Sequence, residues 1–191
     1  MAFNVNDFRS RLTGDGARPN LFNVSLTIPG TIAAGGAAAS AMASFMIKSA
    51  QLPGSTIGTV PQYYFGREMK FAGNRTFPDW TVTIVNDENF LIRNSLESWM
   101  NSIGSHVGNV RNIAAVAPRQ YTSDSLVTQY NKDGSVSKQY NFVGLFPVDV
   151  STIDLDWGSN DSIEEYSVTF AYQYWTSAPF TDNDTTATII V

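Results

Sequence analysis

Apolar and polar residues alternate in several separate stretches of the chain. The clearest alternation covers residues 166–174, and shorter ones cover residues 22–28 and 80–84. A period of two residues is typical of a strand with one buried face. Further strands are predicted from apolar content and flanking turns at residues 45–52, 67–72, 126–130, 136–143 and 148–155, with a glycine turn at residues 73–74.

Helical spacing occurs in two places. Ile92, Leu96, Trp99 and Ile103 follow one another at steps of four, three and four. Asp87 is a good N-cap residue before this run and Gly104 a good stop after it, so the pattern predicts one substantial helix. A shorter amphipathic helix is predicted for residues 5–12, ending at Gly14.

The order of these elements defines a fold class. Seven or eight strands with one substantial helix, and no alternation of strand and helix, predict an antiparallel β-sandwich or barrel with a helix packed on it. An Asp-Gly turn at residues 131–135 joins two of the strands as a hairpin. We expect a single domain over residues 1–175, followed by a C-terminal tail over residues 176–191.

Two segments lack a clear period. Residues 29–41 are mostly Gly, Ala, Thr and Ser, which predicts an extended, flexible loop at a hairpin tip, although alanine also favours helix. Residues 55–65 are weakly patterned but rich in aromatic side chains. They suit either a loop folded onto its own core or an arm that packs on a neighbouring subunit, and the residues alone leave both interpretations open.

Composition restricts the function classes. Charged residues make up only 15% of the chain, against roughly 25% in an ordinary soluble domain, which fits either a large β-rich core or apolar surface buried between subunits. The absence of cysteine excludes disulfides and thiolate chemistry, and a net charge of −5 is poorly suited to gripping nucleic acid. No apolar run is long enough for a membrane span or a secretory signal, so we expect a soluble protein made in a cytoplasm.

No arrangement of residues supports catalysis or metal binding. His106 is the one histidine and lies in a loop rich in Gly, Ser and Asn, and the acids around Asp154 lack the spacing of a calcium loop. Asp154 and Asp156 beside Trp157 could suggest sugar cleavage, but alternating acids are more simply the solvated face of a strand. We therefore expect no enzyme activity, no cofactor and no metal.

A series of short motifs resembles one family, the tail tube proteins of contractile-tailed bacteriophages. The resemblance runs in order over residues 18–175. The motifs are Arg-Pro-Asn-Leu-Phe at 18–22, Gln-Leu-Pro-Gly at 51–54, Phe-Ala-Gly-Asn-Arg-Thr-Phe at 71–77, Asp-Trp-Thr-Val-Thr at 79–83, Asn-Asp-Glu at 86–88, Gly-Leu-Phe-Pro at 144–147, Leu-Asp-Trp at 155–157 and the Tyr-Trp end at 174–175.

This resemblance implies a structural virion protein. Six copies would form a ring, and rings would stack into the inner tail tube inside a contractile sheath, through which DNA enters the host cell. Implied partners are further copies of the chain, the sheath, baseplate and tail terminator proteins, and a tape-measure protein in the lumen. DNA would pass without specific binding, the monomer would not insert into membranes, and assembly would take place in the host cytoplasm.

The resemblance also assigns roles to particular residues. It favours the arm for residues 55–65, with Leu52, Pro53, Val60, Tyr63 and Phe65 packed across an interface. An acidic lumen would repel DNA phosphates, with Asp149, Asp154 and Glu165 as candidates. The alternatives are a tube subunit of a DNA-free contractile injection particle and, from a different class, a carbohydrate-binding β-sandwich that uses Trp157.

Overall fold

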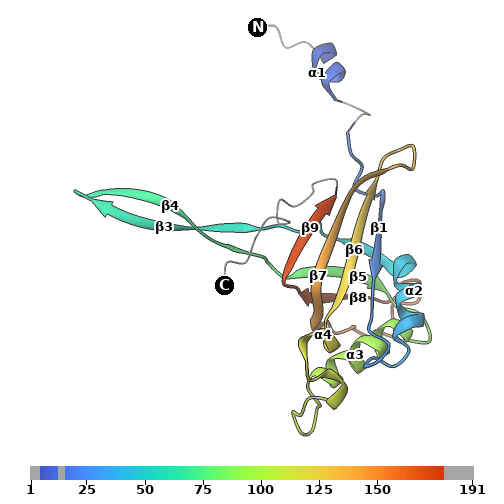
Figure 1. Cartoon of the computed structure of the whole chain (residues 1–191). Helices are drawn as coiled ribbons and strands as arrows, with labels where there is room; N and C mark the ends of the chain where they lie inside the picture. The colour runs from blue at the N-terminus through green and yellow to red at the C-terminus, as the bar shows by residue number, and fades with distance from the viewer. Residues whose placement is uncertain (1–4, 13–15, 179–191) are drawn as a thin grey trace.

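A computed structural model describes residues 5–12 and 16–178. The described chain is mainly β, arranged as an upright body with one long hairpin reaching away from it (Figure 1). The strands are β1 (Phe22–Leu26), β2 (Ile47–Ala50), β3 (Thr56–Tyr64), β4 (Arg67–Thr76), β5 (Trp80–Val85), β6 (Ser123–Tyr130), β7 (Val136–Val150), β8 (Glu165–Ala171) and β9 (Tyr174–Ala178). The helices are α1 (Val5–Arg11), α2 (Gly36–Met46), α3 (Leu91–Ile103), the 3₁₀ turn η2 (Ile113–Ala115) and α4 (Pro118–Tyr121).

The body is a sandwich-like fold built around β7. The first part of β7 pairs with β6 and β9, and its last part pairs with β8, in an overall strand order β1-β6-β7-β8-β5-β2. All of these pairings are antiparallel. One long strand therefore belongs to both halves of the sandwich.

The change of direction in β7 depends on Gly144. This residue has φ +69°, a left-handed conformation that costs little only for glycine. It lies within the register shift between β6 and β7, and its backbone N–H donates to Asp124 Oδ1 at 3.0 Å. An added Cβ would lie 2.8 Å from Gln173 Cγ. Gly144 thus permits the bulge at which β7 passes from one half of the sandwich to the other.

Aromatic side chains fill the centre of the sandwich. Trp80 from β5 stacks on Phe142 from β7 with ring centroids 4.4 Å apart, and Phe170 from β8 lies 5.8 Å from Trp80. All three side chains are almost completely buried. The alternation that predicted β5 and β8 is confirmed, because Val82, Val168 and their inward neighbours are buried while the intervening residues are not.

Helix α3 covers one side of this core, as its apolar spacing predicted. Ile92, Leu96 and Trp99 are fully buried, and Trp99 Nε1 donates to the carbonyl of Tyr121 at 2.7 Å. The helix starts differently from the expectation. Phe90, in a left-handed conformation, is the N-cap residue, and Asp87 contributes from the preceding turn by accepting the Leu91 N–H at 3.1 Å.

The predicted loop at residues 29–41 is wrong in its second half, which forms the start of α2. Ala39 and Ala43 are buried, and Ser40 Oγ accepts the Ile28 N–H at 2.8 Å, so the helix is held against the end of β1. Gly36 lies so close to the Ile28 carbonyl that a Cβ would come within 3.0 Å. The helix preference of alanine therefore determines the structure of this segment, because tertiary contacts support the helix.

Of the two alternatives expected for the fold class, a sandwich or a barrel, the structure confirms the sandwich. Within the described residues β1 and β2 end the strand order without pairing to each other, so the sheet is not a closed barrel. Four further expectations need correction. The expected strand at 148–155 is the end of β7, which stops at Val150, and the alternation at 166–174 is broken at residues 172–173. The expected turn at residues 73–74 lies inside β4, where Gly73 permits close approach to the Gly58 backbone. Of the expected tail, residues 176–178 belong to β9, and 179–191, like Gly14, lie outside the described residues.

Candidate assembly surfaces

The hairpin of β3 and β4 is the most unusual feature of the molecule. The two strands pair antiparallel from Thr56 with Thr76 to Tyr64 with Arg67, and the turn is made by Phe65 and Gly66, both at positive φ. The hairpin projects from the body as a single two-stranded ribbon (Figure 1). We call residues 55–76 the arm. Every residue of β3 is exposed, and so is every residue of β4 except the half-buried Gly73.

The arm carries a large amount of apolar surface. Phe65 at its tip is 93% exposed and Tyr63 is 72% exposed. An isolated two-stranded hairpin is marginally stable in water, and large exposed apolar patches usually mark interfaces. The other exposed apolar side chains of the arm are Ile57, Val60, Tyr64, Met69 and Phe71.

The root of the arm is tied to the body by two indole groups. Trp80 Nε1 donates to the Gln51 carbonyl at 2.7 Å, and Trp175 Nε1 donates to the Gly54 carbonyl at 3.0 Å. These bonds flank Leu52, which is exposed, and Pro53, which is half-buried. The structure therefore places Leu52 and Pro53 at the fixed root, Val60 midway, and Tyr63 and Phe65 at the tip.

The acidic candidates do not form one cluster. Asp149 is exposed on β7 and pairs in register with Thr169. Glu165 lies on the same outward face of β8 as Thr169, and its Oε1 accepts from Lys48 Nζ at 2.5 Å. Asp154 lies beyond the end of β7, in the exposed loop that leads to β8.

The residues considered for sugar chemistry lie in that same loop. Trp157 is 100% exposed, and Asp156 Oδ1 accepts the Gly158 N–H at 3.0 Å. The interpretation of Asp154 and Asp156 as the solvated face of a strand is wrong, because β7 has already ended at Val150 and Leu155 between them is largely exposed as well. His106 is also exposed, as expected of a loop histidine.

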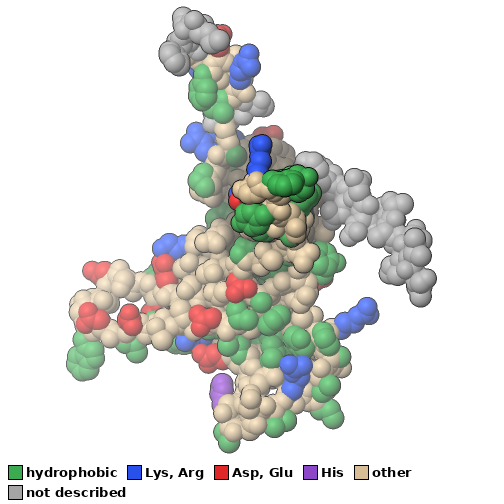
Figure 2. All heavy atoms as spheres, turned by 90° about the vertical axis from the view of Figure 1, so that its left-hand side faces the viewer, with side chains coloured by type: hydrophobic (Ala, Val, Ile, Leu, Met, Phe, Trp, Pro, Cys, Tyr) green, Lys and Arg blue, Asp and Glu red, His purple; other side chains and the backbone are tan. Residues whose placement is uncertain are grey.

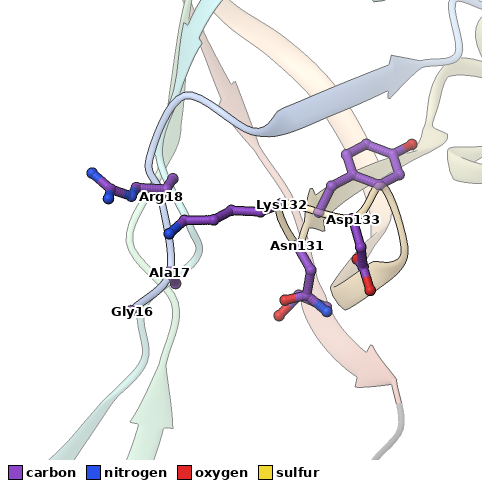
Figure 3. Close-up of a pocket in the computed structure, with 8 residues that line it drawn as sticks. Gly16, Ala17, Arg18, Asn131, Lys132 and Asp133 are labelled. Atoms are coloured by element: carbon purple, nitrogen blue, oxygen red, sulfur yellow. The ribbon is translucent and has the colours of Figure 1, made fainter. Parts of the chain in front are cut away.

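Two of the hollows in the surface contain charged side chains. One lies between Gly16–Arg18 and the β6–β7 turn, where the Lys132 side chain extends toward Ala17 and Arg18 (Figure 3). In that turn, hydrogen bonds from the Ser135 side chain and backbone lower the pKa of Asp133. The charged side chains of this hollow do not form a nucleophile with an adjacent base.

The second hollow lies between the start of α3 and the acidic end of the β7–β8 loop. Asn86 Nδ2 donates to Glu164 Oε2 at 2.8 Å there. Nearby, burial raises the pKa of Tyr166, whose ring lies under the Arg93 guanidinium. Among the described residues, no group of three or more His, Cys, Asp or Glu side chains is placed to hold a metal ion, and no helix is long and apolar enough to cross a membrane.

Sequence reasoning missed two features of these surfaces. It placed a short strand and a turn where the arm has one long ribbon. The Phe-Gly pair at 65–66 between two β-prone stretches was the available signal for the hairpin turn. It also missed a group of exposed valine and isoleucine side chains after α3, at Val107, Val110, Ile113 and Val116.

Comparison with known proteins identifies one family. The model of the phage tail tube protein family matches residues 17–178. Tail tube protein gp19 of Enterobacteria phage T4 is 36% identical over 164 residues, which is 85% of this chain and 93% of that protein. The tail tube protein of Serratia phage KSP90 is 25% identical over 170 residues, 88% of this chain and 93% of that protein.

Solved structures show the same fold at low sequence identity. The tube-terminating cap of the anti-feeding prophage aligns with a TM-score of 0.59 and 18% identity, over 84% of this chain and 89% of that chain. The sheath–tube complex of an extracellular contractile injection system, PVC, aligns with a TM-score of 0.55 and 16% identity, over 92% of this chain and 98% of that chain.

Proposed function

Because this chain belongs to the phage tail tube protein family, we propose that it is the structural subunit of a tail tube, with hexameric rings stacked inside a contractile sheath. In this function the chain contributes surfaces rather than catalytic groups. The tube is the conduit through which DNA leaves the virion, and the protein is a component of the tail. We propose no enzyme activity and no cofactor.

The arm is the observation that carries the proposal. It extends away from the body, its strands pair only with each other, and its apolar side chains contact little of their own chain. Such a ribbon gains stability when it lies on a second copy. We propose that Val60, Tyr63 and Phe65 pack on a neighbouring subunit, and that Leu52 and Pro53 fix the angle at which the arm leaves the body.

A repeated arm contact also explains how a filament arises. The arm of one copy meets a different surface of the next copy, which is a head-to-tail contact. When the rotation between copies closes, such contacts give rings, and rings that stack give an open-ended tube. The chain would act as one domain in this assembly, and this domain includes β9, which ends at Ala178.

The charge of the chain supports passage of DNA. A ring of six copies would carry about −30 formal charges, six times the −5 of one chain. We propose that Asp149, Asp154 and Glu165 contribute to an acidic lumen. Repulsion between these carboxylates and phosphates keeps DNA from adhering while it moves. Glu165 contributes less than the other two, because Lys48 partly neutralises it.

Further partners follow from the role in a tail. We propose contacts with the sheath along the outside, with the tail terminator and baseplate at the two ends, and with a tape-measure protein in the lumen. Assembly would take place in the host cytoplasm. The curated relatives named above are phage tail tube proteins, one of them 36% identical to this chain. They favour a phage tail over a DNA-free injection particle.

Electron microscopy of the purified protein tests this function. The chain is concentrated with and without a baseplate as seed and imaged. Six-fold rings or hollow tubes are the expected result. If the protein remains monomeric at high concentration even with the seed, the tube function is refuted, and glycan binding at Trp157 becomes the next measurement.

A further inference from the structure

A surface separate from the arm combines apolar side chains with positive charge. Residues 105–119, here called the basic loop, connect α3 to β6 and expose Val107, Val110 and Ile113, the last at 88%. The segment contains two arginines, Arg111 and Arg119, and no acidic residue, in a chain that is acidic overall. No carboxylate of the described residues forms an ion pair with either arginine.

The basic loop is held in a defined shape. The Asn112 N–H donates to the Ser102 carbonyl at 3.0 Å, and Asn112 Oδ1 accepts the Ala114 N–H at 2.9 Å. Ala115 is fully buried and anchors the short 3₁₀ turn. The exposed apolar side chains are therefore presented on an anchored backbone.

A second loop has the opposite charge and a similar apolar content. Residues 152–164, here called the acidic loop, contain four acidic residues and no basic one. Leu155, Trp157 and Ile163 are largely or fully exposed in it. Its two ends are tied down, since Arg93 Nη1 donates to the Ser151 carbonyl at 3.2 Å and Asn86 Nδ2 donates to Glu164 at 2.8 Å.

The two loops lie at opposite ends of α3. Arg93, in the first turn of the helix, contacts the start of the acidic loop, whereas the basic loop begins directly after Gly104 at the other end. A helix of 13 residues is about 20 Å long at 1.5 Å per residue. In the space-filling view several acidic side chains (red) gather at the left of the body (Figure 2). The two loops therefore contact α3 at points about 20 Å apart on one copy.

We propose that the acidic loop of one copy docks on the basic loop of a second copy, as a head-to-tail contact additional to the arm. The opposite charges steer the encounter and fix its orientation. Trp157, the most exposed aromatic side chain of the acidic loop, enters the apolar surface formed around Ile113, with Arg111 and Arg119 facing Asp156 and Asp161. Tryptophan and arginine are the residues that most often dominate protein interfaces.

This proposal deepens the tube function and rests on it. Asp154 belongs to the acidic loop and Glu165 forms an ion pair with Lys48. Asp149 is therefore the lumen candidate whose charge is least affected by ion pairing. A second copy fits this surface because the chain itself supplies the complementary loop, in charge and in apolar content.

The absence of native cysteine gives a direct test. In the double variant Ile113→Cys with Trp157→Cys, assembled under oxidising conditions, a head-to-tail contact joins Cys of one copy to Cys of the next. We expect a ladder of disulfide-linked species on non-reducing gels, up to six copies if the contact lies within a ring and longer if it joins rings. Each single variant should stay monomeric on the gel, and an equimolar mixture of the two should give dimers only.

Charge reversal provides a second test that does not depend on a disulfide. The variant Arg111→Glu with Arg119→Glu, or Asp156→Lys with Asp161→Lys, should raise the concentration needed for assembly at least about tenfold. Mixing the two variants should restore assembly, because alternating copies again present opposite charges. Arg111→Lys with Arg119→Lys keeps the charge and should assemble normally.

The outcomes separate this inference from the tube function. If wild-type protein forms tubes while the double-cysteine variant gives no ladder and both reversed variants assemble at unchanged concentration, the loop contact is refuted and the tube function stands. If each reversed variant fails and their mixture fails too, while both remain folded by circular dichroism, the two loops affect assembly without pairing with each other, and the proposal is also refuted. If wild-type protein forms no tubes, the tube function itself fails.

Discussion

Removing the aromatic tip of the arm should separate assembly from folding. In the double variant Tyr63→Ala with Phe65→Ala, two side chains that are 72% and 93% exposed in the single chain are cut back. Because they contact little of their own body, the free energy of unfolding of the monomer should change by less than about 0.5 kcal/mol. Any larger effect of the variant then belongs to contacts between copies.

The size of the assembly effect follows from the exposed area. An aromatic side chain offers about 150–250 Å² for burial, so these two present together roughly 330 Å² to a neighbour. At about 25 cal/mol per Å² this area corresponds to an upper limit of roughly 8 kcal/mol. Association costs and the area that alanine retains reduce it, and we expect a loss of about 4 kcal/mol per contact, typical of two strong interface residues.

The assay measures the critical concentration for tube formation by sedimentation. A loss of about 4 kcal/mol raises it about a thousandfold, which abolishes tubes at concentrations where wild-type protein assembles. Gln62→Ala, which removes a polar side chain from the opposite face of the same strand, is the matched control and should leave the critical concentration nearly unchanged. A shift below about tenfold in the double variant would show that the arm tip is not an interface.

Three smaller predictions concern the body of the molecule. Gly144→Ala should lower the free energy of unfolding by about 1–3 kcal/mol, because a side chain at φ +69° is strained and Gln173 must move. Tyr166→Phe should leave stability unchanged or raise it by up to about 3 kcal/mol, since the buried Tyr166 hydroxyl has no hydrogen-bond partner among the described residues. The lowered pKa of Asp133 means that its carboxylate stabilises the β6–β7 turn above the ordinary aspartate pKa and that this contribution is lost as pH falls through the lowered value.

Each of these has a direct measurement. Urea denaturation of the dilute monomer measures the free energy of unfolding for the Gly144 and Tyr166 variants. Gly134→Ala is the control that separates backbone strain from crowding, because Gly134 has a similar φ but open space around it. A loss of more than about 2 kcal/mol in Tyr166→Phe would show that the hydroxyl does form a stabilising bond. For Asp133, an NMR titration of the side-chain carboxyl should give a pKa below 3.8 that returns toward 3.8 in Ser135→Ala, and an unshifted wild-type value would contradict the assignment.

The sequence predicted those strands in which one face is buried by the chain itself. Trp80, Val82 and Ile84 are buried while Thr81 and Thr83 between them are only half-buried, so burial and alternation coincide. Helix α3 was predictable for the same reason, because its apolar stripe matches the side that packs on the core. The family resemblance was carried largely by such segments and by the turns between them.

The missed elements are those whose contacts with the rest of the fold are not reflected in the apolar and polar pattern of their own residues. Helix α2 presents small alanine side chains to β1, which gives almost no contrast between its faces. The arm shows no alternation of burial because both of its faces are exposed in a single chain, so its strand at residues 56–64 looked like a loop. At the bend of β7, Gln173 leaves no room for a Cβ on Gly144, and this crowding from 29 positions away is not revealed by any local pattern.

The candidate site was predictable only in part. The aromatic content of residues 55–65 left open a loop or an arm, the family resemblance favoured the arm, and the structure has a ribbon at this place. The charge complementarity of the acidic and basic loops was present in the composition of the two segments, but only the position of both at the ends of α3 makes a contact between copies a specific hypothesis.

A helical reconstruction from electron micrographs of tubes assembled from the purified chain tests the central claim most directly. It measures the symmetry of each ring and the position of the arm in the wall. Six copies per ring, with Tyr63 and Phe65 buried against a neighbouring copy, is the predicted result. Tubes in which the arm points into solvent, or a protein that yields only monomers with or without a seed, would contradict the account.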